Sequence, residues 1–315
     1  MLKNLSANYK KIVYFLFFVL IVFFLTFREI KFDKQFFYFD TVFNISVWMP
    51  WYKSLYVFTA LESRLDKFEK RFSVHIKEST ASLFNEQRAE FPLDPDFYEI
   101  FSLACEVWRN TDGKFDITIF PAVSAYGFYS REYHIPDQNE IAGLKRIIGF
   151  DKLLIKTNRL IKKNLQIKID LGGIAKGYAI DQLGEYLKTR KISRFIIEGG
   201  GDVLLGKLKP GNLPYKVGIQ EPRSDDIYKI IEVHSAAIVT SGDYRRFFIT
   251  NNIRYHHIID PHLLVPSRSC ASVTVLASNA ALADALCTAF FILGEKWFEK
   301  NSSKFPGVQA WFIKE

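Results

Sequence analysis

One apolar stretch of the sequence carries an acid and an alcohol at helical spacing. Residues 280–293 read AALADALCTAFFIL, which predicts a buried helix. Asp284 and Thr288 are four residues apart and would share one face of that helix. A buried carboxylate needs a partner or a metal ion, and carboxylate and hydroxyl oxygens suit Mg²⁺. The alternative is a structural salt bridge to Arg245 or Arg246, with Thr288 bonding back to its own helix; the pattern favours the metal site.

A second segment combines a carboxylate, a glycine turn and a lysine. Residues 168–178 read KIDLGGIAKGY, so that Asp170 stands just before Gly172-Gly173, and a predicted helix begins there. A helix N-terminus presents free N–H groups and partial positive charge, and glycines allow close approach, which suits phosphate or pyrophosphate. Lys176 adds a cation one turn into the helix. An ordinary capped helix is the alternative, and the spacing of a Walker A loop is absent.

Two more regions hold groups that could take part in chemistry. Residues 240–246 and 255–261 place His257 near Asp260, and a histidine beside a carboxylate can act as a base or a ligand. Taken alone, these positions are better explained as turn residues and an edge-strand histidine pair. Residues 113–128 interleave aromatic side chains with Gly and Pro, which suits a stacking wall for a flat ring or, equally, a loop that lines the core.

We expect residues 36–315 to form one domain of mixed helices and strands, and this domain must position these groups. Helical periodicity appears at 51–72, 96–109, 174–190 and 278–293. An aromatic and β-branched run predicts a strand at 36–48, and shorter strands are predicted at 194–198, 202–205, 215–220, 228–233, 236–240, 246–249, 254–259 and 272–276. Because helices and strands do not alternate strictly, we expect an α+β fold with largely antiparallel strands.

The N-terminal segment predicts a location. Residues 12–27, IVYFLFFVLIVFFLTF, carry no charge and would span about 24 Å as a helix. Lys10, Lys11 and Arg28 can reach outward to extend that span. Because no small-residue cleavage site follows, residues 1–34 are expected to form an uncleaved signal anchor. The flanking positive charges are balanced, but a short stub before a large body favours export, which in a bacterium means an inner-membrane anchor and a periplasmic domain.

Composition excludes several functions. The chain has 315 residues and a formal net charge of +8, with a large share of the positive charge near the N-terminus. The body lacks the basic stripe of a nucleic-acid-binding protein. Three cysteines, Cys105, Cys270 and Cys287, are too few and too scattered for a disulfide framework or a zinc site.

Taken together and in chain order, these segments resemble the ApbE family of flavin transferases. IDLGGIAKGYAID at residues 169–181 is close to the family's DLGGIAKG motif, and FDITIFPAVSAYGF at 115–128 is similar to its FDPTVGPLVNLWGF segment. EGGGDV at 198–203 matches its glycine-rich turn. The segments VGIQEPR, TSGDYRRFF, HIIDP and SVTVLASNAALADALCTA follow in the family's order, so the resemblance covers roughly residues 36–300.

The resemblance implies an FAD:protein FMN transferase. Such an enzyme uses Mg²⁺ to cleave the pyrophosphate of FAD and attaches FMN through a phosphoester to a Thr, or sometimes a Ser, of an acceptor flavoprotein, while AMP leaves. The implied metal ligands are Asp284, Thr288 and the backbone carbonyl of Gly173. The implied FAD contacts are Ala125, Tyr126, Gly127, Asp170, Lys176 and Ile258. His257 is the candidate base for the acceptor hydroxyl, with His256 and Asp260 as substitutes.

The sequence departs from the family pattern in two places. Phe39-Asp40-Thr41 stands where the family usually has Met-Gly-Thr, and His262-Leu263-Leu264 follows HIIDP where Arg-Thr-Gly is common. Two other functions fit the same residues: an FAD pyrophosphatase that releases FMN and AMP, and a non-catalytic, membrane-tethered FAD-binding protein. By analogy alone, the acceptor is expected to be a membrane or periplasmic electron-transport flavoprotein.

Overall fold

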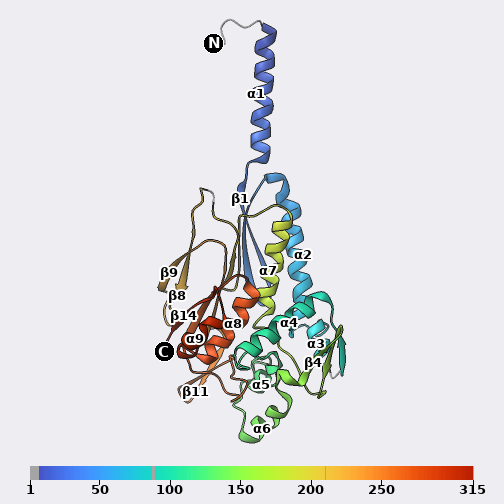
Figure 1. The fold of residues 1–315 in the computed structure, drawn as a ribbon, viewed down its shortest axis with the longest axis vertical. Helices are drawn as coiled ribbons and strands as arrows, with labels where there is room; N and C mark the ends of the chain where they lie inside the picture. Colours follow the sequence, from blue (N-terminus) through green and yellow to red (C-terminus); the bar gives the residue numbers. More distant parts are fainter. Residues whose placement is uncertain (1–6, 87–88, 210, 315) are drawn as a thin grey trace.

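The computed structural model describes residues 7–86, 89–209 and 211–314. The first six residues of the predicted anchor and the last residue of the predicted domain lie outside them. Helix α1 (Ala7–Phe27) contains the predicted span and projects from the body as a separate rod (Figure 1). Its segment Lys10–Phe27 is long and apolar enough to cross a membrane, and none of it is buried against the body.

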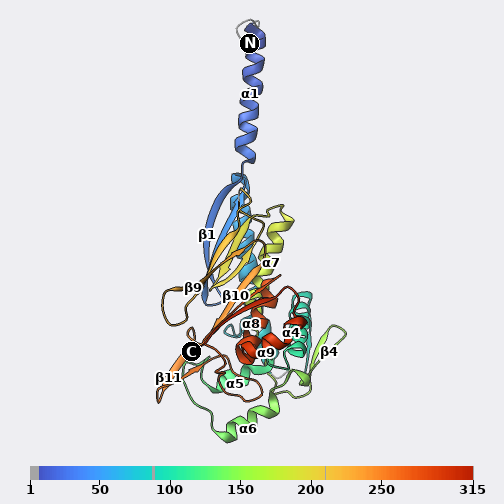
Figure 2. The ribbon, with the colours of Figure 1, turned by 60° about the vertical axis from the view of Figure 1, so that its left-hand side comes forward.

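A seven-stranded antiparallel sheet runs through the body (Figure 2). Its strands, in spatial order, are β1 (Ile30–Tyr38), β2 (Thr41–Met49), β6 (Phe195–Gly199), β7 (Asp202–Leu205), β10 (Ala237–Gly242), β13 (Ser272–Ala277) and β14 (Gln309–Ile313). The predicted α+β class with antiparallel strands is thereby confirmed.

The predicted single strand at 36–48 is wrong, because this region is a β-hairpin. Strands β1 and β2 pair from Ile30↔Met49 to Tyr38↔Thr41, and the turn is made by Phe39 and Asp40, both with positive φ. The turn contains neither Gly nor Pro, so its sequence resembles that of a continuous strand. The sheet therefore begins at Ile30, before the predicted domain boundary.

Four helices cover one face of the sheet and enclose the main core. They are α2 (Ser54–Phe72), α4 (Pro95–Asn110), α7 (Ala175–Thr189) and α8 (Ala280–Leu293), which agree closely with the predicted helices. Helix α8 is the most buried of these, and α7 packs beside it. A two-stranded ribbon, β8 (Tyr215–Gln220) with β9 (Ile227–Val233), packs over part of the opposite face around a second, smaller core.

Shorter elements complete the end of the body farthest from α1 (Figure 1). They include the hairpin of β11 (Phe247–Thr250) with β12 (Ile253–His256), the three-stranded sheet of β3 (Glu90–Pro92), β5 (Arg159–Lys162) and β4 (Leu153–Lys156), and the helices α3 (Thr80–Asn85), α5 (Phe120–Ala125), α6 (Gln138–Ile147) and α9 (Glu295–Asn301). The 3-10 turns are η2 (Trp51–Lys53), η3 (Ile117–Ile119), η4 (Phe150–Lys152) and η5 (Ser302–Lys304). A third apolar cluster joins α5 and α6 to the β11–β12 hairpin.

Candidate functional site

An extended segment, residues 167–171, carries the first part of the site. Its side chains alternate. Ile167, Ile169 and Leu171 are fully buried, and Lys168 and Asp170 lie on the other side. The side-chain amide of Asn85 takes the place of a neighbouring strand: it donates to the Ile169 carbonyl at 2.9 Å and accepts from the Ile169 N–H at 2.7 Å. Lys168 and Asp170 are therefore held in fixed positions at the protein surface.

Both carboxylate oxygens of Asp170 accept hydrogen bonds. Oδ1 accepts from the backbone N–H of Gly172 at 2.7 Å, and Oδ2 accepts from the hydroxyl of Tyr129 at 2.5 Å. Burial, together with the charge of Asp170, raises the pKa of Tyr129 well above its usual value, so the phenol keeps its proton and remains the donor. These bonds fix the orientation of the carboxylate immediately before α7.

The three predicted metal ligands meet where α7 and α8 cross. Asp284, in the second turn of α8, is only 6% exposed, and its Oδ2 accepts from the backbone N–H of Gly177 at 3.2 Å. The Thr288 hydroxyl donates to the Asp284 carbonyl oxygen at 3.3 Å. A Cβ built on Gly173 would lie 3.0 Å from Thr288 Oγ1, so the Gly173 backbone adjoins that hydroxyl. Residues more than 100 positions apart thus form one site.

The donor set fits a hard divalent cation. Oδ1 of Asp284 makes no hydrogen bond among the described residues, and Thr288 uses its hydroxyl hydrogen, which leaves oxygen lone pairs to bind a metal. Within the part of the chain that the structure describes, no group of three His, Cys, Asp or Glu side chains could hold a metal. Nor does Asp284 pair with Arg245 or Arg246 there, since Arg246 donates to the Phe128 carbonyl. A metal bound here would have one carboxylate, one hydroxyl and the adjoining Gly173 backbone as its candidate ligands.

Lys176 links this site to the glycine-rich turn between β6 and β7. Its Nζ forms an ion pair with the buried Asp202 and donates to the Gly199 carbonyl at 3.3 Å. Burial lowers the pKa of Lys176, and the negative charge of Asp284 opposes that shift. Burial likewise raises the pKa of Asp284, opposed by the charge of Lys176. The two side chains therefore form an electrostatically linked pair beside Thr288 and Gly173, the other two predicted metal ligands.

The Phe39-Asp40-Thr41 turn, which departs from the family pattern, lies beside the glycine-rich turn between β6 and β7. A Cβ built on Gly200, whose φ is +60°, would lie 2.7 Å from Thr41 Oγ1. The Phe39-Asp40-Thr41 segment therefore contacts the glycine-rich turn that receives Lys176, although its first two residues differ from Met-Gly.

His257 has the hydrogen-bond pattern of a neutral base. Its Nδ1 lies 3.2 Å from the carbonyl oxygen of Arg246, which can only accept, so Nδ1 carries the proton and Nε2 keeps a lone pair. Burial and the nearby charge of Arg246 lower the pKa of His257 to about 3. The side chain is therefore neutral at physiological pH.

The two substitutes for that base are occupied elsewhere. Nε2 of His256 lies 2.6 Å from the Ser267 carbonyl, and its Nδ1 accepts from the backbone N–H of Ile258 at 3.3 Å. Burial raises the pKa of Asp260, but two short hydrogen bonds from Lys114, at 2.7 and 2.8 Å, outweigh it and leave the pKa below its usual value. His256 is thus a structural core histidine and Asp260 a stabilised carboxylate.

The predicted flavin contacts at 125–127 and at Ile258 are mostly inward-facing. Tyr126 is 2% exposed, and its hydroxyl donates to the Leu264 carbonyl at 3.1 Å. Gly127 has φ +81°, and a Cβ there would overlap the carbonyl oxygen of Glu132. Ile258 is 6% exposed. Of the two alternatives left open for residues 113–128, the rings of Tyr126 and Phe128 follow the core-lining one, since both are buried, whereas Ala125 lines a cavity.

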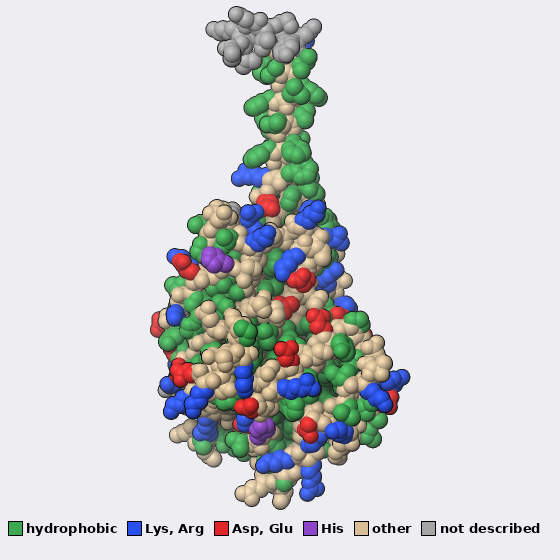
Figure 3. All heavy atoms as spheres, in the orientation of Figure 1, with side chains coloured by type: hydrophobic (Ala, Val, Ile, Leu, Met, Phe, Trp, Pro, Cys, Tyr) green, Lys and Arg blue, Asp and Glu red, His purple; other side chains and the backbone are tan. Residues whose placement is uncertain are grey.

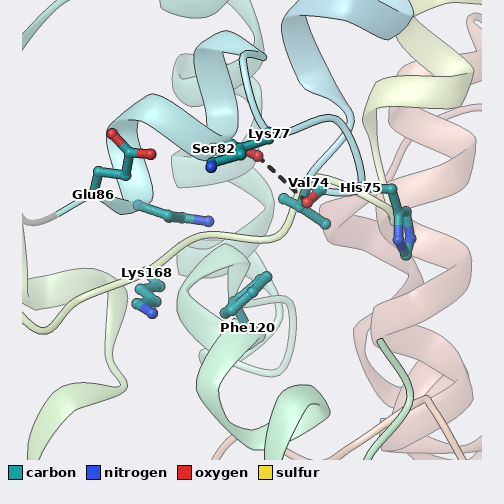
Figure 4. A pocket seen from close by; sticks show the side chains of 8 residues that line it. Val74, His75, Lys77, Ser82, Glu86, Phe120 and Lys168 are labelled. Atoms are coloured by element: carbon teal, nitrogen blue, oxygen red, sulfur yellow. Dashed lines mark hydrogen bonds between the residues drawn. The ribbon is translucent and has the colours of Figure 1, made fainter. Parts of the chain in front are cut away.

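Two neighbouring cavities, of about 320 and 400 Å³, share Phe120 and Lys168 as lining residues. Figure 4 shows the first one, between α3 and the start of α5, with Phe120 and Lys168 facing Ser82 and Glu86. Phe120 stacks on Tyr129 with ring centroids 4.5 Å apart and planes 16° apart. Phe120, inside the 113–128 segment, and Tyr129, the residue that follows it, therefore form a stacked aromatic pair next to these cavities.

Sequence reasoning missed several of these residues. Asn85, and also His75, which lines the first cavity, belong to a region, 73–86, in which no periodicity indicated an element. Phe120 and Lys168 lie in the segments 113–128 and 168–178, and Tyr129 directly follows the first of them. Residue type alone does not show that these side chains reach the surface while their neighbours are buried. Only the placement of α3 against the extended segment brings them together.

Fold and site together define an α+β protein in which a carboxylate, a hydroxyl and a lysine gather where two helices cross, a donor set suited to phosphoryl transfer. A family model described as the ApbE family matches residues 39–312. A protein from Vibrio cholerae named FAD:protein FMN transferase is 32% identical over 245 residues, which are 76% of this chain and 73% of that protein. A Buchnera aphidicola protein of the same name is 31% identical over 253 residues, covering 77% and 74% of the two chains.

Solved structures agree with the sequence relatives. The crystal structure of the ApbE protein from Thermotoga maritima superposes with a TM-score of 0.81 at 32% identity, covering 89% of this chain and 93% of that one. The flavin transferase ApbE from Vibrio cholerae gives a TM-score of 0.80 at 26% identity, covering 90% and 97%. The chain belongs to the ApbE family. The predicted resemblance and the prediction of a transferase enzyme are confirmed at this level.

Proposed function

We propose that this protein transfers FMN from FAD to a Thr, or a Ser, of an acceptor flavoprotein, with Mg²⁺ bound and AMP released. The observation that carries the proposal is the meeting of Asp284, Thr288 and the Gly173 backbone beside Lys176. Mg²⁺ held by these three oxygens would neutralise the charge of the FAD pyrophosphate. The names of the relatives support the same reaction.

The chain's own residues supply positioning and charge. Asp170, oriented by Tyr129 and Gly172, and the lysine Lys176 contact FAD, and Ala125 with the backbone of residues 126, 127 and 258 completes the nucleotide site. Phosphoryl transfer depends mainly on such positioning and on electrostatic stabilisation. The flat ring of the flavin has a matching surface in Phe120 and Tyr129.

His257 is the proposed base. Its Nε2 lone pair accepts the proton of the acceptor hydroxyl as that oxygen forms a bond to the phosphorus of the FMN unit. The bond from that phosphorus to the bridging oxygen breaks at the same time, and the oxygen leaves with AMP. The low pKa of His257 keeps Nε2 unprotonated over the whole physiological pH range.

We further propose that α1 is a membrane anchor and that the catalytic domain, which begins with β1 at Ile30, lies in the bacterial periplasm. The length and apolar character of Lys10–Phe27 support this, as does the fact that none of this segment is buried in the body. The acceptor would then be a membrane or periplasmic electron-transport subunit. The proposal includes no nucleic-acid partner.

The test compares the wild-type chain with Asp284→Asn. Detergent-solubilised full-length protein is incubated with FAD, Mg²⁺ and membranes of the source organism taken from a strain that lacks the chain. Covalent FMN is read as fluorescent bands after denaturing electrophoresis. We expect Asp284→Asn to reduce labelling on the order of 10²-fold or more, because the metal's charge stabilisation is lost. Asp226→Asn, an exposed carboxylate on the loop before β9, is the matched control and should label normally.

Two further readouts separate the alternatives. Mn²⁺ binding followed by electron paramagnetic resonance should weaken at least about 10-fold in Asp284→Asn and stay unchanged in Asp226→Asn. Chromatography of the nucleotides without membranes identifies the reaction. Fast AMP release without an acceptor would indicate an FAD pyrophosphatase, and FAD that stays bound and intact with acceptor present would indicate a binding protein. Full labelling by Asp284→Asn would refute the metal site.

A further inference from the structure

The end of the body next to α1 carries a group of exposed apolar side chains on η2 and the first turn of α2. Leu55 is 81% exposed and Trp51 59%, with Tyr52 at 40% and Tyr56 at 44%. We call these four residues the junction patch. A single exposed Leu needs no explanation, but four large apolar side chains within six residues of one another do.

The junction patch is continuous with the end of α1. The Tyr52 ring contacts the ring of Phe27, the last residue of α1, with centroids 6.0 Å apart and planes at 82°. Figure 1 shows η2 and α2 beginning directly below the rod that α1 forms. A helix that spans a bilayer places the residues at its end in the headgroup layer. The surface beside Phe27 would therefore lie at that depth.

Basic side chains surround the same surface. Nζ of Lys53 donates to the Arg190 carbonyl oxygen at 3.1 Å, which brings the C-terminal end of α7, with exposed Arg190 and Lys191, next to η2. Arg28 follows α1 directly. In Figure 3, Lys and Arg side chains gather where the rod meets the body. Basic groups are attracted to an anionic bilayer surface, so the charge complements lipid headgroups.

We propose that the junction patch is a membrane-interface surface: Trp51, Tyr52, Leu55 and Tyr56 enter the headgroup layer of the bilayer that α1 spans and hold the body in one orientation. Trp and Tyr favour this depth because an apolar ring can meet the acyl chains while its polar atom stays hydrated. The inference rests on the proposed anchor, and it adds a fixed orientation to what would otherwise be a flexible tether.

The experiment places a nitroxide spin label at Leu55→Cys in the full chain, reconstituted in nanodiscs of phosphatidylethanolamine and phosphatidylglycerol. The background substitution Cys105→Ser removes the partly exposed native thiol, while Cys270 and Cys287 are buried. Label collisions with dissolved oxygen and with a water-soluble nickel chelate report depth. The matched control is Ile230→Cys on β9, an equally apolar residue that is 59% exposed and lies on the ribbon over the opposite face of the sheet. A label at Phe18→Cys reports α1 itself.

We expect nickel-chelate collisions at position 55 to be several-fold fewer than at 230, with oxygen collisions increased, and position 18 to be more lipid-embedded than either. If position 55 is as accessible to nickel as position 230 while position 18 is in lipid, the anchor stands and the interface surface is refuted. If position 18 is also in water, the anchor fails and the inference fails with it. Shielding of position 55 from both reagents would show that protein covers the patch, which also overturns the proposal.

Discussion

At the residue scale, His257 couples the proposed chemistry to acid stability. An unfolded histidine titrates near pH 6.5, whereas burial and Arg246 lower the pKa of folded His257 to about 3. Between these values the unfolded chain binds a proton that the folded chain does not. This side chain therefore stabilises the fold fully above about pH 6.5, and that contribution is lost as the pH falls toward 3, on the order of 2 kcal/mol by pH 5.

We predict that His257→Gln reduces the loss of folding stability that accompanies a fall in pH. The free energy of unfolding, measured by urea titration of the solubilised chain, should fall less between pH 7.5 and pH 5 in His257→Gln than in wild type, by about 2 kcal/mol. His134→Gln, which removes an exposed histidine on the loop before α6, serves as the control and should follow the wild-type curve. Parallel curves for all three proteins would show that His257 is not held neutral. The same variant should lose flavin transfer by about 10²–10⁴-fold.

At the element scale, the crossing of α7 and α8 depends on one glycine. A Cβ on Gly177 would overlap the carbonyl oxygen of Ala280, and the N–H of Gly177 donates to Asp284. Gly177→Ala should therefore lose about 1–2 kcal/mol of stability, because backbone displacement outweighs the gain of about 1 kcal/mol in helix propensity. Gly143→Ala in α6 has open space around its Cβ and should instead gain about 0.5–1 kcal/mol.

Thermal unfolding of the two glycine variants checks this pair of predictions, which have opposite signs. A stabilised Gly177→Ala would mean that the helices separate at no cost, and would contradict the close crossing. Transfer activity should fall in Gly177→Ala as well, since moving α7 away from α8 displaces the donor to Asp284. Gly143→Ala should keep wild-type activity.

The elements that the sequence predicted well are those with long periodic patterns. Apolar spacing predicts that α2, α4 and α7 are helices and gives their approximate bounds. For α8, the nearly uniform apolar run does the same. The strands of the β3–β5–β4 sheet have three or four residues each, too few for alternation to show. The sequence did not predict the β1–β2 turn, because Phe39 and Asp40 adopt positive φ without a glycine.

The candidate site was predictable where its residues share a helix or a turn and not where tertiary packing joins them. Asp284 and Thr288 are one helical turn apart, so their proximity follows from the sequence. The partnership of Lys176 with Asp202, and of Tyr129 with Asp170, depends on how separate segments pack. The burial of Tyr126 and Phe128 likewise arises from the third core cluster.

At the scale of the whole molecule, α1 predicts how the protein is held in the cell. The full chain should stay with the membrane pellet after an alkaline carbonate wash, because a predominantly apolar span of 18 residues is not displaced by charge or pH. Protease added to intact spheroplasts should digest the body and leave a small anchored fragment. Protection of the body until the cells are lysed would place it in the cytoplasm and refute the proposed orientation.

Helix α7 sets the distance between the bilayer surface and the candidate site. One end of its 15 residues meets Lys53 beside the junction patch, and the other end opens at the residues proposed to bind the metal, about 22 Å away. A body seated on the bilayer would thus carry out the reaction at a set height in the aqueous space. A target hydroxyl close to the lipid surface would be out of reach, whereas one on a loop that projects away from the membrane could be modified. The geometry would therefore select acceptors by the height of the hydroxyl above the bilayer.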